Sequence, residues 1–186
     1  MPWKVSVLPA VEPWTLAEVK SFLKVDTSDE DDLITSLITG SRQAAESYLN
    51  MALISQTIQE RLDVLNKPIL YLSVNPVLSF SNFKYQDSSN TQVTWDNSNY
   101  KVDTCSRPCR LALQFGKSWP TLYGNINDVL LTYVAGFSAQ PSGVPMQIRQ
   151  AILMMVANAY DNREDYVKKM PTASQYLLDQ YRVQYF

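Results

Sequence analysis

The hydrophobic period of this chain changes twice along its 186 residues. Over residues 15–50, apolar side chains recur at steps of three and four, as they do on one face of a helix. Over residues 54–135 they alternate with polar side chains, which is the period of a strand. The helical period returns over residues 145–182. The pattern predicts an α+β fold: a helical bundle formed from the N- and C-terminal parts, with a mostly antiparallel β insertion between them.

The helix starts can be read from local signals. Thr15 and Glu18 have the spacing of a capping box, and Thr27 with Glu30 suggests a second start. Pro145 suits the first turn of a later helix, where a missing N–H costs little. No repeat or linker interrupts the chain. We therefore expect a single domain over residues 1–186 that ends in a short tail, residues 183–186.

Turn residues such as Asn75-Pro76 and Asp87-Ser88 divide the β insertion into short segments. Strands at this spacing are typical of an antiparallel meander or a small sandwich. The expected strands are residues 57–64, 69–72, 77–85, 92–95, 100–102, 111–115 and 129–135.

Composition argues against most catalytic and metal sites. The chain has no histidine, which is the commonest general base and metal ligand, and only five glycines, too few for a phosphate-binding loop. Two cysteines, Cys105 and Cys109, cannot complete a zinc site without carboxylates. We expect no cofactor, no metal and no enzymatic activity. An enzyme that uses carboxylates such as Asp161 and Glu164, or a lysine, stays open as a lesser alternative.

Charge and hydropathy bear on location and partners. The net charge is only −2, and residues 1–54 carry four basic against eight acidic residues, so duplex DNA is not favoured as a tightly bound ligand. The sequence contains neither the roughly 20-residue apolar run of a membrane span nor the pattern of a signal peptide. We expect no membrane contact and a protein made in the cytoplasm.

Aromatic residues lie beside several turns of the β insertion. A sugar or a peptide could stack on them, although antiparallel sheets more often use such rings for packing. A peptide- or sugar-binding module therefore remains an alternative function. The residues concerned are Trp95, Tyr100, Trp119 and Tyr123.

Several short motifs occur along the chain in a characteristic order. In that order and spacing they resemble the head–tail connector (head completion, or adaptor) proteins of tailed bacteriophages, and most closely the variety with a long β insertion that also occurs in prophages and gene transfer agents. The motifs are Leu16-Ala17-Glu18-Val19-Lys20, Asp31-Asp32-Leu33-Ile34, Ala52-Leu53-Ile54-Ser55-Gln56-Thr57, Ser118-Trp119-Pro120, Tyr133-Val134-Ala135-Gly136-Phe137, Val144-Pro145 and Tyr160-Asp161-Asn162-Arg163-Glu164.

The resemblance implies a structural virion protein. Such proteins form a homo-oligomeric ring beneath the capsid portal, extend the DNA channel, and join the head to a stopper or tail-completion protein. Double-stranded DNA would meet the ring only in transit. The expected location is the head–tail junction of the virion, with the host cytoplasm as the place of assembly.

Two sets of residues are candidates for these contacts. A ring needs two different patches on each subunit, and the helix after Pro145, apolar on several sides, suits one of them. Tyr and Arg dominate binding hot spots, so the aromatic C-terminus suits docking onto the portal. The predicted ring-interface residues are Arg149, Leu153, Met154, Tyr160, Arg163 and Glu164. The predicted portal-docking residues are Tyr181, Arg182, Val183, Tyr185 and Phe186.

Overall fold

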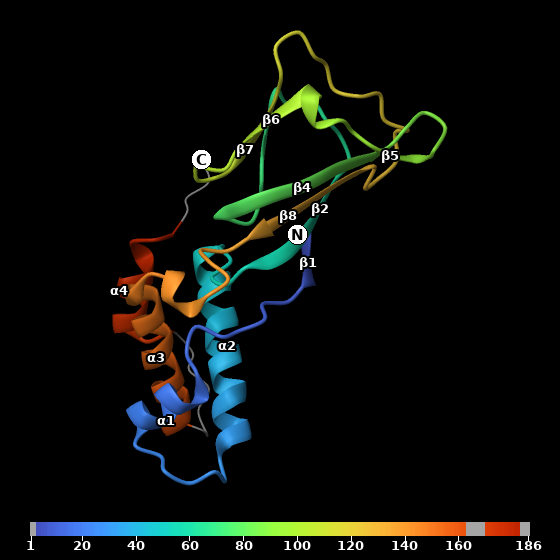
Figure 1. Cartoon of the computed structure of the whole chain (residues 1–186). Helices are drawn as coiled ribbons and strands as arrows, with labels where there is room; N and C mark the ends of the chain where they lie inside the picture. The colour runs from blue at the N-terminus through green and yellow to red at the C-terminus, as the bar shows by residue number, and fades with distance from the viewer. Residues whose placement is uncertain (1–2, 163–169, 183–186) are drawn as a thin grey trace. The chain divides into compact units, whose positions relative to one another are not determined.

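The computed structural model describes residues 3–162 and 170–182. Two compact units emerge from it, each with a core of its own. The β unit comprises Met1–Leu8 and Ser55–Phe137, and the helical unit comprises Pro9–Ile54 and Ser138–Gln184. The predicted α+β class is therefore confirmed, with helices from both parts of the chain in one unit and strands in the other (Figure 1). That both units form one connector domain stays a prediction.

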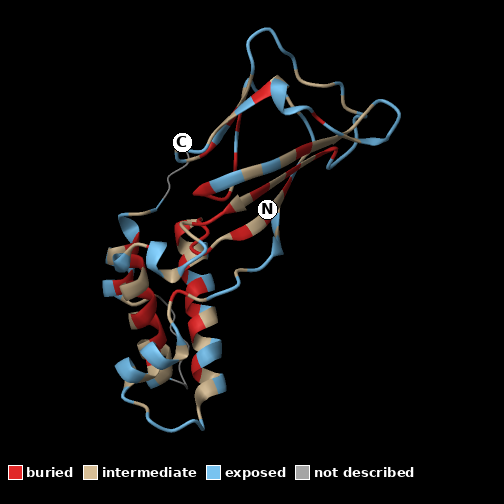
Figure 2. Ribbon diagram, viewed as in Figure 1, coloured by how far each residue is buried: buried red, intermediate tan, exposed pale blue. Residues whose placement is uncertain are grey.

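Four helices build the described part of the helical unit: α1 (Leu16–Leu23), α2 (Asp31–Leu49), α3 (Met146–Asp161) and α4 (Thr172–Asp179). Helices α2 and α4 both pack against α3. Their buried residues lie along the facing sides of α2 and α3 (Figure 2). At helical spacing, these residues include Ile34, Ile38, Ala45 and Leu49 from α2 and Ile148, Ala151, Ile152 and Val156 from α3.

The capping signals were right for one helix and wrong for another. Thr15 and Glu18 form the expected capping box, in which the Thr15 backbone N–H donates to Glu18 at 2.8 Å. The predicted start at Thr27 is wrong, because α2 begins only at Asp31 and its N-cap residue makes no side-chain capping bond. The Thr27 carbonyl instead accepts a hydrogen bond from Lys20 Nζ at 2.7 Å. It thus belongs to the connection between α1 and α2.

A buried ion-pair network connects Glu12, in the segment before α1, to α2. The Arg42 side chain is 4% exposed; its Nε lies 2.7 Å from Glu12 and its Nη1 lies 2.6 Å from Glu46. The other Glu46 oxygen accepts the Leu53 backbone N–H at 2.9 Å, and Thr39 Oγ1 lies 3.1 Å from Glu12. Burial raises the pKa of Glu46, against the lowering effects of the Leu53 N–H and the Arg42 charge. Arg42 is therefore the positive centre that makes burial of this carboxylate tolerable.

Strands of the β unit form two antiparallel sheets. One has the order β1 (Trp3–Val7), β2 (Gln56–Leu62), β8 (Val129–Ala135), β4 (Val77–Gln86) and β5 (Gln92–Thr94). The other has the order β3 (Ile69–Tyr71), β7 (Arg110–Leu113) and β6 (Tyr100–Asp103). Each predicted strand is present, β8 with the predicted ends and the others with shifted ends. β1 was not predicted, and the prediction of a strand through Phe115 is wrong because β7 stops at Leu113.

An aromatic cluster fills the core between these sheets. Phe83, which is fully buried, lies with its ring centroid 4.9 Å from that of Trp95 and 6.2 Å from that of Trp119. Tyr100 stacks on Trp95 at 5.3 Å. Trp95 is only 9% exposed and Tyr100 only 8% exposed. Of the rings considered for sugar stacking, Trp95, Tyr100 and Trp119 are thus used for packing, which is worth about 0.5–1.5 kcal/mol per pair beyond burial, whereas Tyr123 is exposed.

The same core holds a buried carboxylate. Glu60 on β2 is 2% exposed and accepts hydrogen bonds from Tyr133 Oη at 2.8 Å and from the Ser73 hydroxyl at 2.6 Å. The Ser73 backbone N–H donates to it at 3.0 Å. Three donors satisfy the buried oxygens, as such a site requires. These hydrogen bonds explain how the Glu60 carboxylate can be buried in the β unit.

Candidate assembly surfaces

Arg149, at the start of α3, is engaged within its own chain. Its side chain is 11% exposed, its Nε donates to the Pro13 carbonyl at 3.0 Å, and its guanidinium lies 3.9 Å from the Trp14 ring centroid. Trp14 Nε1 in turn donates to the Arg149 carbonyl at 2.6 Å. These contacts hold the segment before α1 against α3. A contact between Arg149 and a neighbouring subunit stays a prediction. In such a contact, Arg149 would have to bind the neighbour while it keeps or gives up its bonds to Pro13 and Trp14.

The other predicted ring-interface residues differ in how much surface they offer. Leu153 is 6% exposed and packs in the core of the helical unit. Met154 and Tyr160 are half-buried, and the Tyr160 hydroxyl donates to the Glu30 carboxylate. Arg163 and Glu164 lie outside the described residues. Of the described set, Met154 and Tyr160 keep surface for a partner, and their role at the ring interface stays a prediction.

The end of α4 is tied to both neighbouring helices. Tyr181 Oη donates to Gln147 Oε1 of α3 at 2.7 Å, and the Arg182 guanidinium lies 5.3 Å from the Tyr48 ring centroid of α2. Tyr48 also donates to Asp179. Val183, Tyr185 and Phe186 lie outside the described residues. The predicted docking tail thus follows directly on a well-anchored point, although portal docking itself stays a prediction.

A groove between α2 and α3 was missed by sequence reasoning. Small side chains at four-residue spacing on α2, Ser36, Gly40 and Ala44, face Met155 and Ala159 of α3 across a cavity of about 370 Å³. A Cβ atom at Gly40 would meet no atom within 4 Å. The four-residue spacing of these small residues could have indicated the groove. It did not, because the same residues are also typical of an exposed helix surface.

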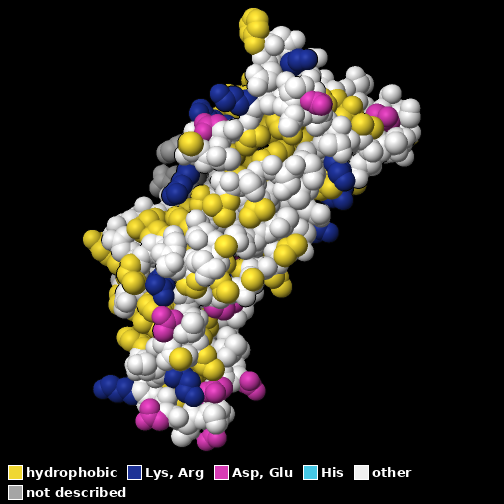
Figure 3. Space-filling view, in the orientation of Figure 1, with side chains coloured by type: hydrophobic (Ala, Val, Ile, Leu, Met, Phe, Trp, Pro, Cys, Tyr) yellow, Lys and Arg dark blue, Asp and Glu magenta, His cyan; other side chains and the backbone are white. Residues whose placement is uncertain are grey.

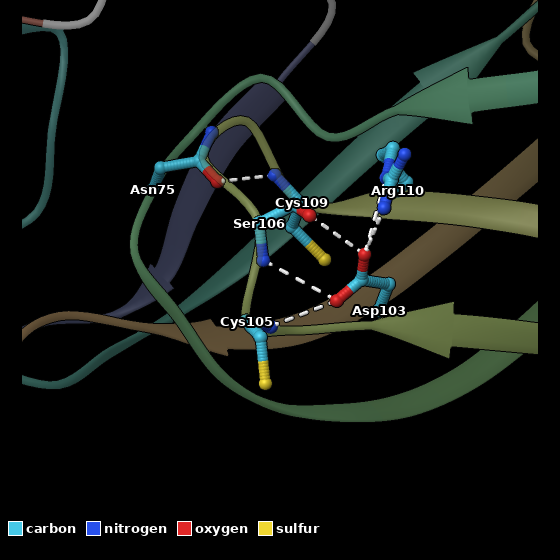
Figure 4. Close-up of polar contacts among 6 residues, drawn as sticks. All are labelled: Asn75, Asp103, Cys105, Ser106, Cys109 and Arg110. Carbon is cyan, nitrogen blue, oxygen red and sulfur yellow. Dashed lines mark hydrogen bonds and ion pairs between the residues drawn. The ribbon is translucent and has the colours of Figure 1, made fainter.

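The loop between β6 and β7 contains both cysteines and is organised by a carboxylate. Asp103 accepts the backbone N–H groups of Cys105 and Ser106 at 3.0 and 3.3 Å and pairs with Arg110 at 2.5 Å (Figure 4). The Ser106 hydroxyl and Arg110 hold the pKa of Asp103 well below its usual range. This is the geometry of a structural turn whose carboxylate stays ionised.

The thiols of Cys105 and Cys109 differ in exposure. Cys105 is exposed, and its side chain points away from the other labelled residues (Figure 4). Cys109 is buried, its backbone N–H donates to Asn75 at 2.8 Å, and burial raises the pKa of its thiol to about 12. A thiol with so high a pKa is a poor nucleophile at neutral pH.

Within residues 3–162 and 170–182, no three carboxylates and thiols gather as metal ligands would. Among the helices of that same part of the chain, none is long and apolar enough to cross a bilayer. Near the start of α2, Asp31 has a local partner, since Lys20 Nζ lies 2.5 Å from it.

Comparison with known proteins agrees with the motifs. Residues 13–102, which run from the segment before α1 to β6, match the model of a family described as phage gp6-like head-tail connector proteins. A comparison with curated proteins finds no match.

Solved structures with the same fold come from particles of gene transfer agents (GTAs). The neck of an empty GTA particle, computed with C6 symmetry, contains a chain with a TM-score of 0.84 and 21% identity, over 100% of this chain and 97% of that one. The virion of a native GTA particle gives a TM-score of 0.82 and 20% identity, over 100% and 97%. The neck of a native GTA particle, computed with C12 symmetry, gives 0.76 and 22%, over 98% and 97%.

The family match and the shared fold together confirm the resemblance that the motifs indicated: over residues 13–102 this chain is similar in sequence to the phage gp6-like head–tail connector proteins.

Proposed function

We propose that this chain is a structural protein of the virion neck, where copies of it form a ring beneath the portal. The observation that carries this proposal is the match of residues 13–102 to the head–tail connector family. The fold shared with chains in the necks of GTA particles, solved with C6 and C12 symmetry, supports it. In this role the ring extends the DNA channel and joins the head to a stopper or tail-completion protein.

The physical character of the described residues suits such a role. Their buried polar groups, such as Glu60 and Arg42, serve packing within a unit. Open surface is found instead at the groove between α2 and α3 and at exposed apolar side chains such as Phe115 and Ile126. Cyclic assembly joins two different patches of each subunit, so a ring subunit needs several separate contact areas of this kind.

DNA contact in this proposal is transient. A channel wall that bound phosphates tightly would hinder passage, because each neutralised phosphate adds to affinity through counterion release. The net charge of −2 and the acidic excess of residues 1–54 favour weak contact. Peptide or sugar binding by the β unit is less well supported, since Trp95 and Tyr100 are buried in the aromatic cluster.

Light scattering tests assembly directly. The chain alone is expected to behave as a monomer or a weak oligomer over a range of concentrations, because the portal supplies the template that brings copies together. Adding the portal protein encoded beside it should yield a complex of much larger mass that contains many copies. A portal from an unrelated phage serves as the control and should leave the mass unchanged. A tight dimer that never joins the portal would contradict the proposal.

A further inference from the structure

Phe115 is the most exposed large apolar side chain of the described residues, at 103% of its reference exposure. It follows β7 in a tight turn, in which the Lys117 N–H donates to the Gln114 carbonyl at 3.0 Å. Gly116 takes a φ of 75°, which a glycine adopts without strain. The Gln114 N–H is bound to the Asn99 carbonyl at 2.9 Å. The turn thus holds a phenyl ring in solvent.

The loop that continues from this turn, residues 114–127, is held at further points. Trp119 Nε1 donates to the Lys67 carbonyl at 2.9 Å, and its ring belongs to the aromatic cluster. The Tyr123 N–H donates to the Gln86 carbonyl at 3.1 Å, and the Asn127 N–H donates to Asp63 at 2.7 Å. A contact residue on so well-ordered a loop loses little conformational entropy on binding, which favours affinity.

A hollow of about 460 Å³ lies on the outer face of the three-stranded sheet in the same β unit. The inner face of that sheet carries the buried Leu70 and Leu111. Alternate residues face outward, so Ile69 and Ala112 provide an aliphatic floor, with Lys101 and Arg110 beside it. Asp103 also lines the hollow and pairs with Arg110, so Lys101 is the cation there that forms no ion pair with another described residue. Figure 3 shows hydrophobic side chains beside Lys and Arg on the surface of the β unit.

The chemistry of the hollow suits an aromatic ring. Aliphatic side chains pack against the ring, and cations are attracted to its face when they lie within about 6 Å of the centroid. The loop of residues 114–127 has one cation, Lys117, and no carboxylate. A single cation is a weak basis for binding nucleic acid, whose affinity grows with the number of neutralised phosphates. A protein surface is the better partner for Phe115.

Phe115 does not occupy the hollow of its own chain, because its side chain is fully exposed. Strand pairing places Leu113 opposite Tyr100 and Arg110 opposite Asp103. These pairs are three residues apart, roughly 10 Å at about 3.3 Å per residue. Phe115 lies beyond the first pair, whereas the hollow extends beyond the second, to Cys105. The β unit therefore carries an aromatic projection toward one end of β7 and a matching hollow toward the other, as a head-to-tail contact between copies requires.

We propose that Phe115 of one copy inserts into the hollow of the next copy, between Ile69, Ala112 and Arg110. The inference rests on the proposed function, because the ring brings the copies side by side. Repetition of one contact around the ring makes each β unit both donor and acceptor. The partner of the three-stranded sheet is thus a second copy of this chain.

The exposed Cys105 at the edge of the hollow allows a direct test. In portal-bound rings of the Phe115→Cys variant, the assembly holds the copies side by side and so places the new thiol near Cys105 of the neighbouring copy, and a mild oxidant such as diamide accepts two electrons and two protons as the disulfide forms. Cys109 is excluded by its burial and its pKa of about 12. A link within one chain is excluded because disulfides need Cα atoms closer than about 7 Å. In portal-bound rings, a reducible ladder of multimers is expected.

Two control variants make the result specific. Tyr176→Cys places a thiol at a side chain of 70% exposure in the helical unit, and Phe115→Cys combined with Cys105→Ser removes the acceptor. Cross-linking of Phe115→Cys should be about 100-fold faster than in either control, because docking raises the effective concentration of the two thiols. If rings of full mass form and no reducible dimer appears, the inference is overturned while the proposed function stands.

Assembly itself distinguishes the remaining outcomes. If the unmodified chain forms no ring on the portal, the proposed function and this inference both fail. If only Phe115→Cys fails to assemble, Phe115→Tyr decides: assembly with tyrosine supports the aromatic contact, and equal loss with tyrosine contradicts it.

Discussion

Deletion of residues 183–186 is expected to abolish attachment to the portal and to leave the fold intact. The deleted segment ends in Tyr185 and Phe186 and follows Arg182, at the point where Tyr181 ties the end of α4 to α3. A hot-spot side chain contributes about 2–4 kcal/mol to binding, so loss of two aromatic rings should weaken attachment at least about 100-fold. The melting temperature should fall by no more than about 2 °C, as for a surface change.

The measurement is portal binding by the truncated and full-length chains, together with retention of DNA by the assembled heads. Heads completed with the truncated chain should leak DNA. Tyr176→Ser is the matched control, because it removes an exposed ring from α4 itself and should keep attachment near normal. Native affinity in the truncated chain would show that docking depends on another segment.

Replacement of Arg42 by alanine should destabilise the helical unit by about 3–5 kcal/mol. The substitution removes the guanidinium that lies 2.7 Å from Glu12 and 2.6 Å from Glu46, and the Glu46 side chain is only 12% exposed. A buried carboxylate deprived of its cation carries the cost of desolvation without the compensating attraction. Urea denaturation followed by circular dichroism measures the change. Lys20→Ala, which breaks the more exposed pair with Asp31, should cost less than about 1 kcal/mol.

The loss of stability caused by Arg42→Ala should become smaller as the pH falls. Burial already raises the pKa of Glu46, and removal of Arg42 raises it further. A carboxyl whose folded-state pKa lies above its unfolded value binds a proton more tightly when folded, so its favourable contribution is present at low pH and is lost as pH rises through the folded pKa. The deficit of Arg42→Ala should therefore shrink between about pH 7 and about pH 5. A deficit that grows on acidification would contradict this account of Glu46.

The elements that could be predicted from the sequence are those with strong local signals. β8 was predicted with its observed ends, Val129–Ala135, because alternating apolar residues precede a glycine. The Thr15–Glu18 capping box marked α1. β1 was missed because it is a five-residue edge strand whose partner β2 lies some fifty residues further on. The strand order, and the division into two sheets, depend on such distant pairings.

The surfaces were less predictable, because exposure is decided by contacts between distant residues. The role of Arg149 at a subunit contact stays a prediction, but its contacts with Pro13 and Trp14, more than 130 positions away, could not be predicted from the sequence. Phe115 was expected to end a strand, whereas Gly116 turns the chain and leaves the ring in solvent. Residue type indicates which side chains could contact a partner. Only the fold shows whether contacts within the same chain already engage them.

Electron cryomicroscopy of the portal mixed with this chain tests whether copies of the chain form the proposed ring. We expect a closed ring of copies beneath the portal, coaxial with the DNA channel, into which the helical unit and the β unit of each copy can be fitted. A portal that joins its stopper with no copy of this chain between them would contradict it.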